Sequence, residues 1–294
     1  MRNSQPAPGA LAAWVLIVVL AIGPGRLSAA GAAARPTHAA VRSAAPARAR
    51  RPPRPTPGCK QRALLPAYFY PGPAWRAELD ALRPGSAIIV NPDSGPGTSP
   101  NADYVQVVDA ARSKGALLWG YVDTRYGAAQ PASLAAQVGA YRRWYGITDI
   151  FFDDVSSQAA RVGYYRAASR IVRSAAPHAS VILNPGDYPA PVYASLGDVL
   201  VVFEGDSSRY TKAYPPAWTR RHPPGMFVSL ISAVPPNRLA PTLALARARR
   251  SGWVYVTPHA DDSDLYEQLP GYWGAELHML AAAPSMGPAS TCAG

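Results

Sequence analysis

Two apolar, strand-like stretches of this chain end in carboxylic acids. Residues 150–152 lead directly into Asp153 and Asp154, and residues 199–203 lead into Glu204. Burying an unpaired carboxylate costs several kcal/mol, so an acid at the end of a buried strand needs a compensating role. Two carboxyl groups in unlike environments can divide the work of hydrolysing a glycosidic bond, one protonated and the other ionised. We therefore predict Asp153, Asp154 and Glu204 as catalytic residues.

The arrangement of these acids stays open at the level of sequence. Side chains alternate along a strand, so Asp153 and Asp154 cannot both face the same side of a regular strand. The two acid-bearing strands are separated by one strand, which puts their axes about 9.5 Å apart. Side chains that lean together to about 5–5.5 Å suit a retaining mechanism, and about 6.5–9.5 Å suits inversion. The structural alternative is that Asp153 and Glu204 pair with Arg125 or cap loops.

Other predicted strands also end in polar or aromatic residues. The carboxyl ends of parallel strands in a barrel meet at one mouth, where tyrosine faces suit sugar rings and polar tips suit hydroxyl groups. Two loops rich in Gly and Pro, at residues 91–97 and 184–189, are expected to be rigid turns that aim an asparagine inward. The predicted substrate-binding residues are Tyr68, Tyr70, Asn91, Tyr121, Asp123, Asn184 and Tyr188.

Other chemistries have little support in the sequence. It contains no G-x-S-x-G elbow, no P-loop and no Cys/His spacing suited to zinc, and its five histidines are scattered. The acidic stretch at residues 259–264 lacks the glycine and the distal glutamate of an EF-hand loop, so we expect a solvated loop. We predict no metal and no cofactor.

The elements that must position these residues repeat eight times. Continuous apolar runs alternate with helical patterns, as in parallel strands covered on both faces. Eight units in roughly 235 residues predict an α/β fold, a single (β/α)8 TIM-like barrel, for which about 250 residues is typical. A doubly wound open sheet is the alternative, but no Gly-rich phosphate fingerprint follows the first strand. The predicted strands are 63–69, 86–91, 117–122, 148–153, 180–184, 199–203, 227–231 and 253–257.

Four of the intervening helices are well marked in the sequence. They are predicted at 102–114, 132–145, 161–175 and 239–251, with Asn101 and Asn237 as N-caps. The connections after the fifth and sixth strands are rich in proline, so their helices are expected to be short.

The net charge of +11 belongs to the N-terminal segment. All 18 acidic residues lie at or after Glu78, where 18 of the 29 Lys and Arg residues balance them. Nucleic-acid binding by the domain is therefore not expected. Residues 31–58 are mostly Ala, Pro and Arg and predict a disordered basic linker. Its arginines are suited to contact an anionic cell wall, and a merely solvated tether is the alternative.

Residues 1–30 have the pattern of a secretory signal peptide. Arg2 precedes an apolar run at 10–22, which is shorter than the roughly 20 residues of a membrane span, and small residues follow at 28–30. We expect a secreted or cell-surface protein with no membrane span after cleavage; an uncleaved anchor is the alternative. Cys59 and Cys292 bracket the predicted domain, 59–294, and are expected to form one disulfide, with two free thiols as the alternative.

Several of these segments resemble the spherulin-4, or spherulation-specific, family. They are PAYFYPG at 66–72, NPDSGPG at 91–97, YVDT at 121–124, YRRWYG at 141–146, IFFDD at 150–154, LNPG at 183–186 and VVFEG at 201–205. The resemblance runs from about residue 62 to 273. It implies a (β/α)8 fold and kinship with secreted glycoside hydrolases acting on α-1,4-linked galactosamine or N-acetylgalactosamine polymers.

The resemblance also implies roles for the acids. The acidic pair after strand four of the family falls on Asp153 and Asp154, and the strand-six glutamate falls on Glu204. The second acid of the usual Asp-Glu pair is here Asp154, one methylene shorter. We expect Asp153 to be nucleophile or stabiliser, Glu204 to be general acid/base and Asp154 to support them, with a polysaccharide or oligosaccharide as substrate. The alternatives are a carbohydrate-binding barrel without turnover and a structural envelope or developmental protein.

Overall fold

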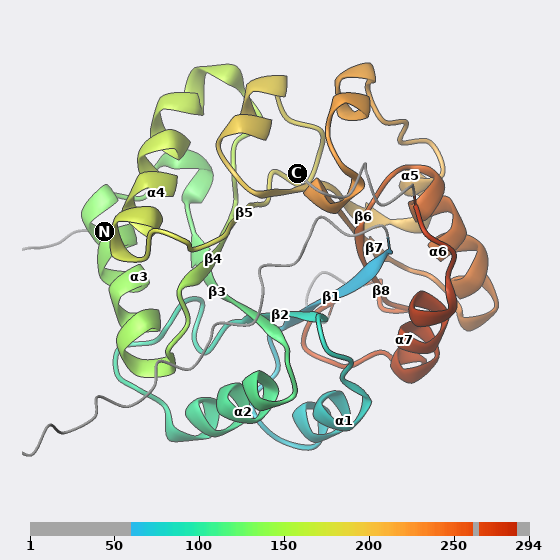
Figure 1. Cartoon of the computed structure of the whole chain (residues 1–294), viewed down its shortest axis with the longest axis horizontal. Helices are drawn as coiled ribbons and strands as arrows, with labels where there is room; N and C mark the ends of the chain where they lie inside the picture. The colour runs from blue at the N-terminus through green and yellow to red at the C-terminus, as the bar shows by residue number, and fades with distance from the viewer. Residues whose placement is uncertain (1–59, 261–264, 287–294) are drawn as a thin grey trace, which may run out of the picture. The chain divides into compact units, whose positions relative to one another are not determined.

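The chain forms one closed barrel of eight parallel strands (Figure 1). The computed structural model describes residues 60–260 and 265–286. Each strand pairs with its neighbours in the sequence, and β8 closes the barrel onto β1. The strands are β1 (Arg62–Ala67), β2 (Ala87–Val90), β3 (Leu117–Asp123), β4 (Asp149–Asp153), β5 (Val181–Leu183), β6 (Val199–Asp206), β7 (Phe227–Ser232) and β8 (Trp253–Val256). The predicted (β/α)8 barrel is therefore confirmed, and the open sheet is excluded.

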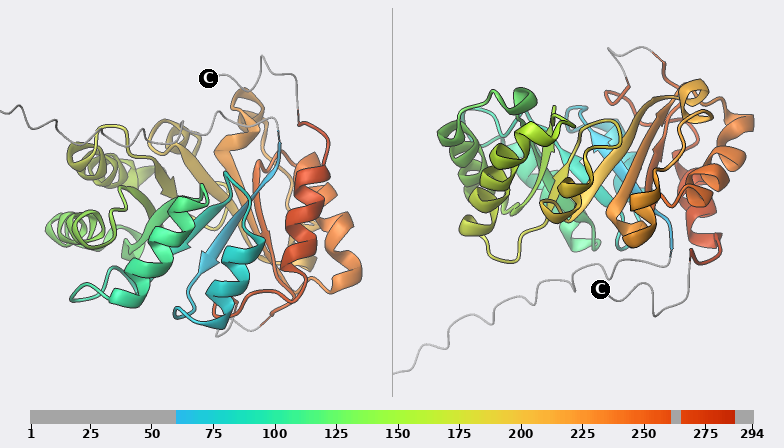
Figure 2. Two further views of the ribbon diagram at one scale, coloured as in Figure 1. Left: turned by 60° about the horizontal axis from the view of Figure 1, so that its bottom comes forward. Right: turned by 90° about the horizontal axis from the view of Figure 1, so that it is seen from above.

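Helices surround the strands (Figure 2). The α-helices are α1 (Pro73–Ala81), α2 (Ala102–Ser113), α3 (Pro131–Tyr145), α4 (Val162–Ala175), α5 (Ser207–Tyr210), α6 (Leu239–Ala248) and α7 (Trp273–Ala282). The connection after β5 holds only the 3-10 turn Pro191–Ser195, and α5 after β6 is a single turn, as the proline-rich sequence predicted. Among the described residues, every helix is too short or too polar to cross a membrane.

Several sequence predictions concern residues that the structure does not describe. The predicted signal peptide, the linker, Cys59, Cys292 and the acidic residues 261–264 all lie outside the described residues.

The predicted N-cap is found at the start of α2 but not at the start of α6. The Asn101 side chain accepts hydrogen bonds from the backbone N–H groups of Asp103 and Tyr104, so the predicted N-cap of α2 is confirmed. The predicted cap at Asn237 is wrong. That residue lies inside the 3-10 turn Pro236–Arg238, which leads into α6 without a side-chain cap.

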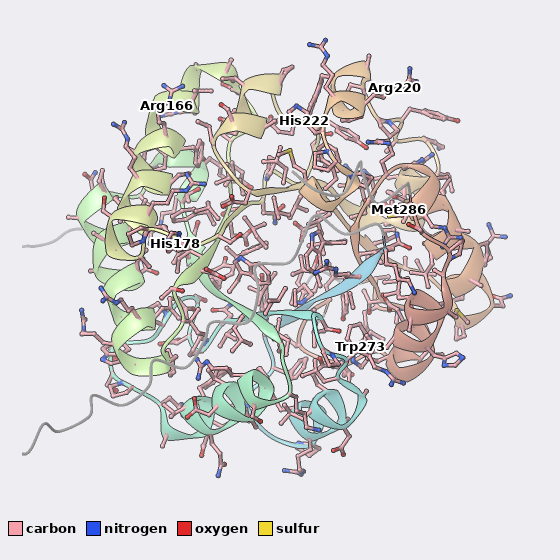
Figure 3. All side chains as sticks on the ribbon, viewed as in Figure 1. Arg166, His178, Arg220, His222, Trp273 and Met286 are labelled. Carbon is pink, nitrogen blue, oxygen red and sulfur yellow. The ribbon has the colours of Figure 1, made fainter. Side chains whose placement is uncertain are left out.

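The packing of α3 against β3 depends on a residue without a side chain. A Cβ at Gly120 would lie 2.6 Å from the ring of Tyr141, so only glycine lets the helix approach this closely. The Tyr141 hydroxyl then donates to the Val90 carbonyl oxygen at 3.0 Å. Apolar side chains fill the space inside the barrel and between strands and helices (Figure 3). This packing holds the strand ends, and hence the acids, in fixed positions.

Strand β6 carries an irregularity directly before its glutamate. Its register with β7 shifts between Val201 and Phe203, which is the signature of a β-bulge. Beyond the bulge the strand continues as far as Asp206, farther than predicted. A bulge turns the following side chains, so it sets the direction of Glu204.

Candidate active site

One asparagine connects the two predicted acids at the mouth of the barrel. The side-chain amide nitrogen of Asn184 donates to Asp153 Oδ1 at 2.7 Å and to Glu204 Oε2 at 2.6 Å. These residues come from the ends of β4, β5 and β6, three consecutive strands. The backbone N–H of Gly186 donates to Asn184 Oδ1 at 2.9 Å and fixes which way the amide points. The Asn184 side chain therefore holds the two carboxyl groups close together.

Half-buried tyrosines surround this pair of acids. The Tyr266 hydroxyl donates to Glu204 Oε1 at 2.6 Å, and the Tyr121 hydroxyl is hydrogen-bonded to Asp153. The Tyr68 ring packs edge-on against both of these rings, with centroid distances of 5.4 Å to Tyr121 and 5.3 Å to Tyr266. Burial and the charges of the acids raise the pKa of Tyr68 and of Tyr266 well above the usual value. All three hydroxyl groups thus stay protonated and can donate.

The electrostatics distinguish the two acids. Burial, together with the neighbouring charge of Glu204, raises the pKa of Asp153 to about 7. Hydrogen bonds from Tyr121 and Asn184 act in the opposite direction without cancelling this rise. Near neutral pH Asp153 therefore keeps a proton that an ordinary aspartate has lost. A carboxyl group that can donate a proton beside a second carboxyl group suits acid–base hydrolysis.

Asp154 lies apart from this pair. Its φ of 48° turns the chain out of the strand, and its carboxylate interacts with the Tyr126 hydroxyl. The stacked rings of Tyr121 and Phe151 place Phe151, and hence Asp153, on the inner face of β4. Of the two neighbouring aspartates, Asp153 is therefore the one that faces the interior of the barrel.

Some of the predicted substrate-binding residues lie next to Asp153 and Glu204, and the others lie on the rim of the barrel mouth. Tyr68, Tyr121 and Asn184 contact or surround the acids, as described above. Asp123 accepts from the backbone N–H of Arg125 at 2.6 Å, and its other oxygen lies 3.8 Å from the Arg125 guanidinium. The ion pair of Arg125 is thus with Asp123 and not with Asp153 or Glu204.

Three predicted residues do not reach the acids. The Tyr70 hydroxyl donates to Asp103 at 2.6 Å and its ring packs against Tyr104. Asn91 accepts from the backbone N–H of Gly95 and so closes its own loop. The ring of Tyr188 packs edge-on against Trp218, with centroids 6.5 Å apart. These three side chains hold the rim of the mouth together.

Sequence reasoning missed Tyr266. This residue follows β8 by ten positions, beyond the strand end where functional residues were sought. Its carbonyl oxygen accepts from the backbone N–H of Tyr68 at 3.1 Å, which ties the last loop to the end of β1. No local signal marks it, because its role depends on the closure of the barrel.

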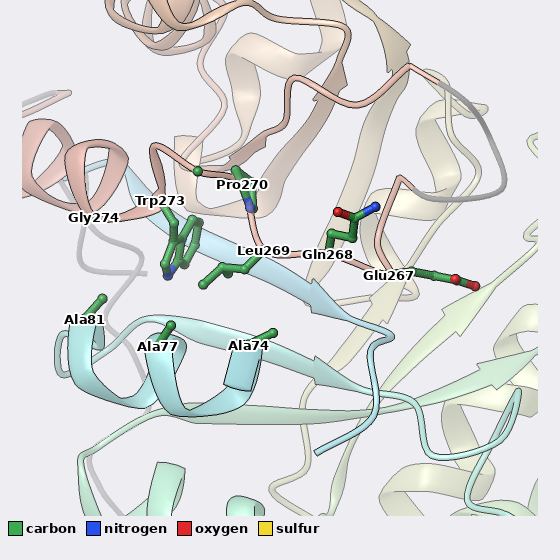
Figure 4. Close-up of a pocket in the computed structure, with 10 residues that line it drawn as sticks. Ala74, Ala77, Ala81, Glu267, Gln268, Leu269, Pro270, Trp273 and Gly274 are labelled. Atoms are coloured by element: carbon green, nitrogen blue, oxygen red, sulfur yellow. The ribbon is translucent and has the colours of Figure 1, made fainter. Parts of the chain in front are cut away.

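A separate cavity lies on the outside of the barrel. It measures about 520 Å³ and lies between α1 and the segment leading into α7 (Figure 4). Its lining includes Ala77, Leu269 and Trp273 but none of the residues of the acid pair. Within the described residues no group of three or more His, Cys, Asp or Glu side chains is placed to hold a metal ion.

Comparison with known proteins identifies the family. The model of spherulation-specific family 4 matches residues 62–280. Spherulin-4 of Physarum polycephalum is 28% identical over 232 residues, which cover 74% of this chain and 70% of that protein. The crystal structure of Aspergillus clavatus Sph3 in complex with GalNAc superposes with a TM-score of 0.68 at 24% identity, covering 77% of this chain and 99% of that one.

More distant barrels include glycoside hydrolases. The active domain 2 of a thermostable chitinase from Pyrococcus furiosus, solved with chito-oligosaccharides, is 12% identical with a TM-score of 0.47, over 75% of this chain and 97% of that one. The family match covers most of the chain, and the eight-stranded barrel agrees with it. This chain belongs to spherulation-specific family 4.

Proposed function

We propose that this chain is a glycoside hydrolase that cleaves an amino-sugar polysaccharide of the α-1,4-galactosamine or N-acetylgalactosamine type. The observation that carries the proposal is the bridge from one Asn184 nitrogen to Asp153 and Glu204, inside a mouth walled by tyrosines. Two carboxyl groups held this close together in a half-buried site are costly for the fold, and such a pair has an evident use in glycoside cleavage.

The pKa of Asp153 supports a division of roles. Asp153 carries the proton near neutral pH, so it donates to the glycosidic oxygen as the bond to the anomeric carbon breaks. Glu204, oriented by Tyr266 and Asn184, attacks the anomeric carbon from the opposite side. Asp153 then takes a proton from a water molecule whose oxygen attacks the anomeric carbon, so that the bond between the sugar and the Glu204 carboxylate breaks. These roles are the reverse of those expected from the family resemblance.

The distance between the acids supports a retaining reaction. Asp153 Oδ1 and Glu204 Oε2 lie 2.7 and 2.6 Å from the same nitrogen, so they cannot be farther apart than those distances combined. That upper limit falls at about the 5–5.5 Å carboxyl separation of retaining glycosidases and below the roughly 6.5–9.5 Å of inverting enzymes.

The substrate class rests on family membership and on the likeness to Sph3, which was solved with GalNAc. We also propose that the protein acts outside the cell, on the basis of the signal-peptide pattern in residues 1–30. A polysaccharide of the extracellular matrix or cell wall would meet the enzyme there.

Digestion of a galactosaminoglycan tests the proposal. The purified chain is expected to release new reducing ends and soluble oligosaccharides, and proton NMR of the first products should show the α configuration of the substrate. Chitin oligosaccharides serve as the control for linkage and sugar. Tight binding of the polymer without any product would instead support a carbohydrate-binding barrel, and products of β configuration would contradict the retaining mechanism.

A further inference from the structure

The backbone is strained where β3 and β4 end. Arg125 and Tyr126 have φ values of 49° and 53°, and Asp154, which faces them from the next strand, has a φ of 48°. These are three of the six non-glycine residues with positive φ in the described parts of the chain. Side chains other than glycine rarely adopt this conformation, and strain that persists in a folded protein points to a functional constraint.

Hydrogen bonds hold the two strained turns together. The backbone N–H of Tyr126 donates to the Asp154 carbonyl oxygen at 2.7 Å. Buried Thr124 reinforces the contact, because its hydroxyl oxygen lies 2.8 Å from the Asp153 carbonyl oxygen and 2.7 Å from that of Asp154. The turn that carries Tyr126 is thus anchored to the turn that follows the catalytic candidate Asp153.

This arrangement presents an aromatic ring to solvent beside the acid pair. Tyr126 is 61% exposed, although it is one of the large hydrophobic residues of the chain. Its hydroxyl is hydrogen-bonded to the Asp154 carboxylate, and the charges of Asp153 and Asp123 also act on it. The ring therefore lies near the acids and is fixed in orientation both by its backbone and by its hydroxyl.

We propose that Tyr126 forms a sugar-stacking subsite next to the cleavage site, and that Asp154 is a positioning residue that orients the Tyr126 ring. A rigid tyrosine face suits the apolar face of a pyranose ring, and its fixed orientation lowers the entropy lost on binding. The subsite would hold a sugar unit beside the one that is cleaved, so its ligand is a longer stretch of polysaccharide. The inference rests on the proposed function, whose sugar class it adopts.

Binding of galactosaminoglycan oligosaccharides tests the subsite separately from catalysis. Isothermal titration measures the binding of a long oligosaccharide and of a disaccharide. The two proteins compared are Asp153→Asn, which serves as the unaltered chain for binding, and Asp153→Asn with Tyr126→Gly. The Asp153→Asn change is present in both so that no cleavage interferes. The Tyr126→Gly protein is expected to bind the long oligosaccharide about ten-fold more weakly. Its affinity for the disaccharide and its melting temperature should not fall, because glycine accepts this φ without strain. Tyr126→Phe should keep part of the affinity.

Asp154→Ala provides the second arm. It is expected to weaken binding of the long oligosaccharide when Tyr126 is present and to have no further effect in the Tyr126→Gly protein. The matched control is Tyr214→Ala, since Tyr214 is also exposed, at 78%, but packs against Arg249 instead of an acid. Control and unaltered proteins should bind alike.

The outcomes separate this inference from the proposed function. Equal affinities of the Tyr126→Gly and unaltered proteins for the long oligosaccharide would overturn the subsite, whether or not the chain is an enzyme. An unaltered chain that binds the oligosaccharide through Tyr126 yet never cleaves it would leave the subsite standing and overturn the hydrolase. No binding of either oligosaccharide would overturn both.

Discussion

The Asp153→Asn and Glu204→Gln proteins are each expected to lose at least about a thousand-fold in kcat/KM on galactosaminoglycan, because each removes one half of an acid–base pair. Both changes keep the size of the side chain. Asparagine at position 153 also removes a group whose pKa burial raises to about 7, so the Asp153→Asn protein should be no less stable than the unaltered one. Loss of activity without loss of stability distinguishes a functional acid from a structural one.

The pH dependence gives a second signature of the same pair. Activity requires the proton on Asp153, so kcat/KM of the unaltered protein should fall as the pH rises through about 7.

The matched control for the Asp153→Asn and Glu204→Gln proteins is Asp80→Asn, because Asp80 is exposed on α1 and lies outside the acid pair. If the Asp153→Asn and Glu204→Gln proteins retain the activity of this control, Asp153 and Glu204 are not the catalytic acids.

The Glu78→Gln protein is expected to have a stability that varies less with pH than that of the unaltered protein. Glu78 of α1 and Glu276 of α7 are both fully buried. Tyr255 of β8 lies near both glutamates, the indole of Trp273 lies near Glu78, and the backbone N–H of Val256 donates to Glu276 Oε1 at 3.2 Å. Burial raises the pKa of Glu78 from 4.5 to about 7, and that of Glu276 well above its usual value.

The direction of this pH dependence follows from proton binding to Glu78. Between pH 4.5 and about 7 the folded protein keeps a proton on Glu78 that the unfolded chain has lost. The free energy of unfolding therefore falls as the pH rises through this interval, and it stays lower above pH 7. At about 1.4 kcal/mol for each pKa unit, the total contribution of Glu78 is on the order of 3 kcal/mol.

Urea unfolding at pH 5 and pH 8 measures this effect. The difference between the two free energies of unfolding should be smaller for the Glu78→Gln protein than for the unaltered one. The control is Glu267→Gln, an exposed glutamate at the edge of the outer cavity, which should match the unaltered protein at both pH values. Parallel changes in all three proteins would contradict the assignment of this pH dependence to Glu78.

The strands and most helices were predictable because parallel barrel strands are buried on both faces. Strands buried on both faces consist of continuous apolar runs, and the polar residue after each run marks the strand end. The Asn101 cap was also predictable, since its contacts lie within three residues of it. The cap at Asn237 was not, because a 3-10 turn starting at Pro236 moves the helix start beyond it.

The site was predictable in its residue types and only partly in its geometry. Asp153 and Glu204 followed from their positions at strand ends, but the choice between Asp153 and Asp154 depends on the backbone turn at Asp154. The direction of Glu204 depends on the bulge in β6, which hydrophobicity alone does not reveal. Tyr266 depends on the closure of the barrel, which brings the loop after β8 next to β6.

The predicted residues that do not reach the acid pair have one physical feature in common. Tyr70, Asn91 and Tyr188 all follow strand ends, yet each finds a partner within its own rim segment or the next one. A polar side chain near a strand end can satisfy its hydrogen bonds locally, and residue type alone does not distinguish that case from an inward one.

Mass spectrometry of a trapped sugar–protein intermediate is the most direct test of how Asp153 and Glu204 act together. The chain would be incubated with a 5-fluoro-α-N-acetylgalactosaminyl fluoride, digested with a protease, and the labelled peptide sequenced. One sugar is expected on Glu204, and none in the Glu204→Gln protein. A label on Asp153 would contradict these roles, and a label on Asp154 or another acid outside the pair, or cleavage of the reagent with inversion and no label at all, would contradict the action of the pair itself.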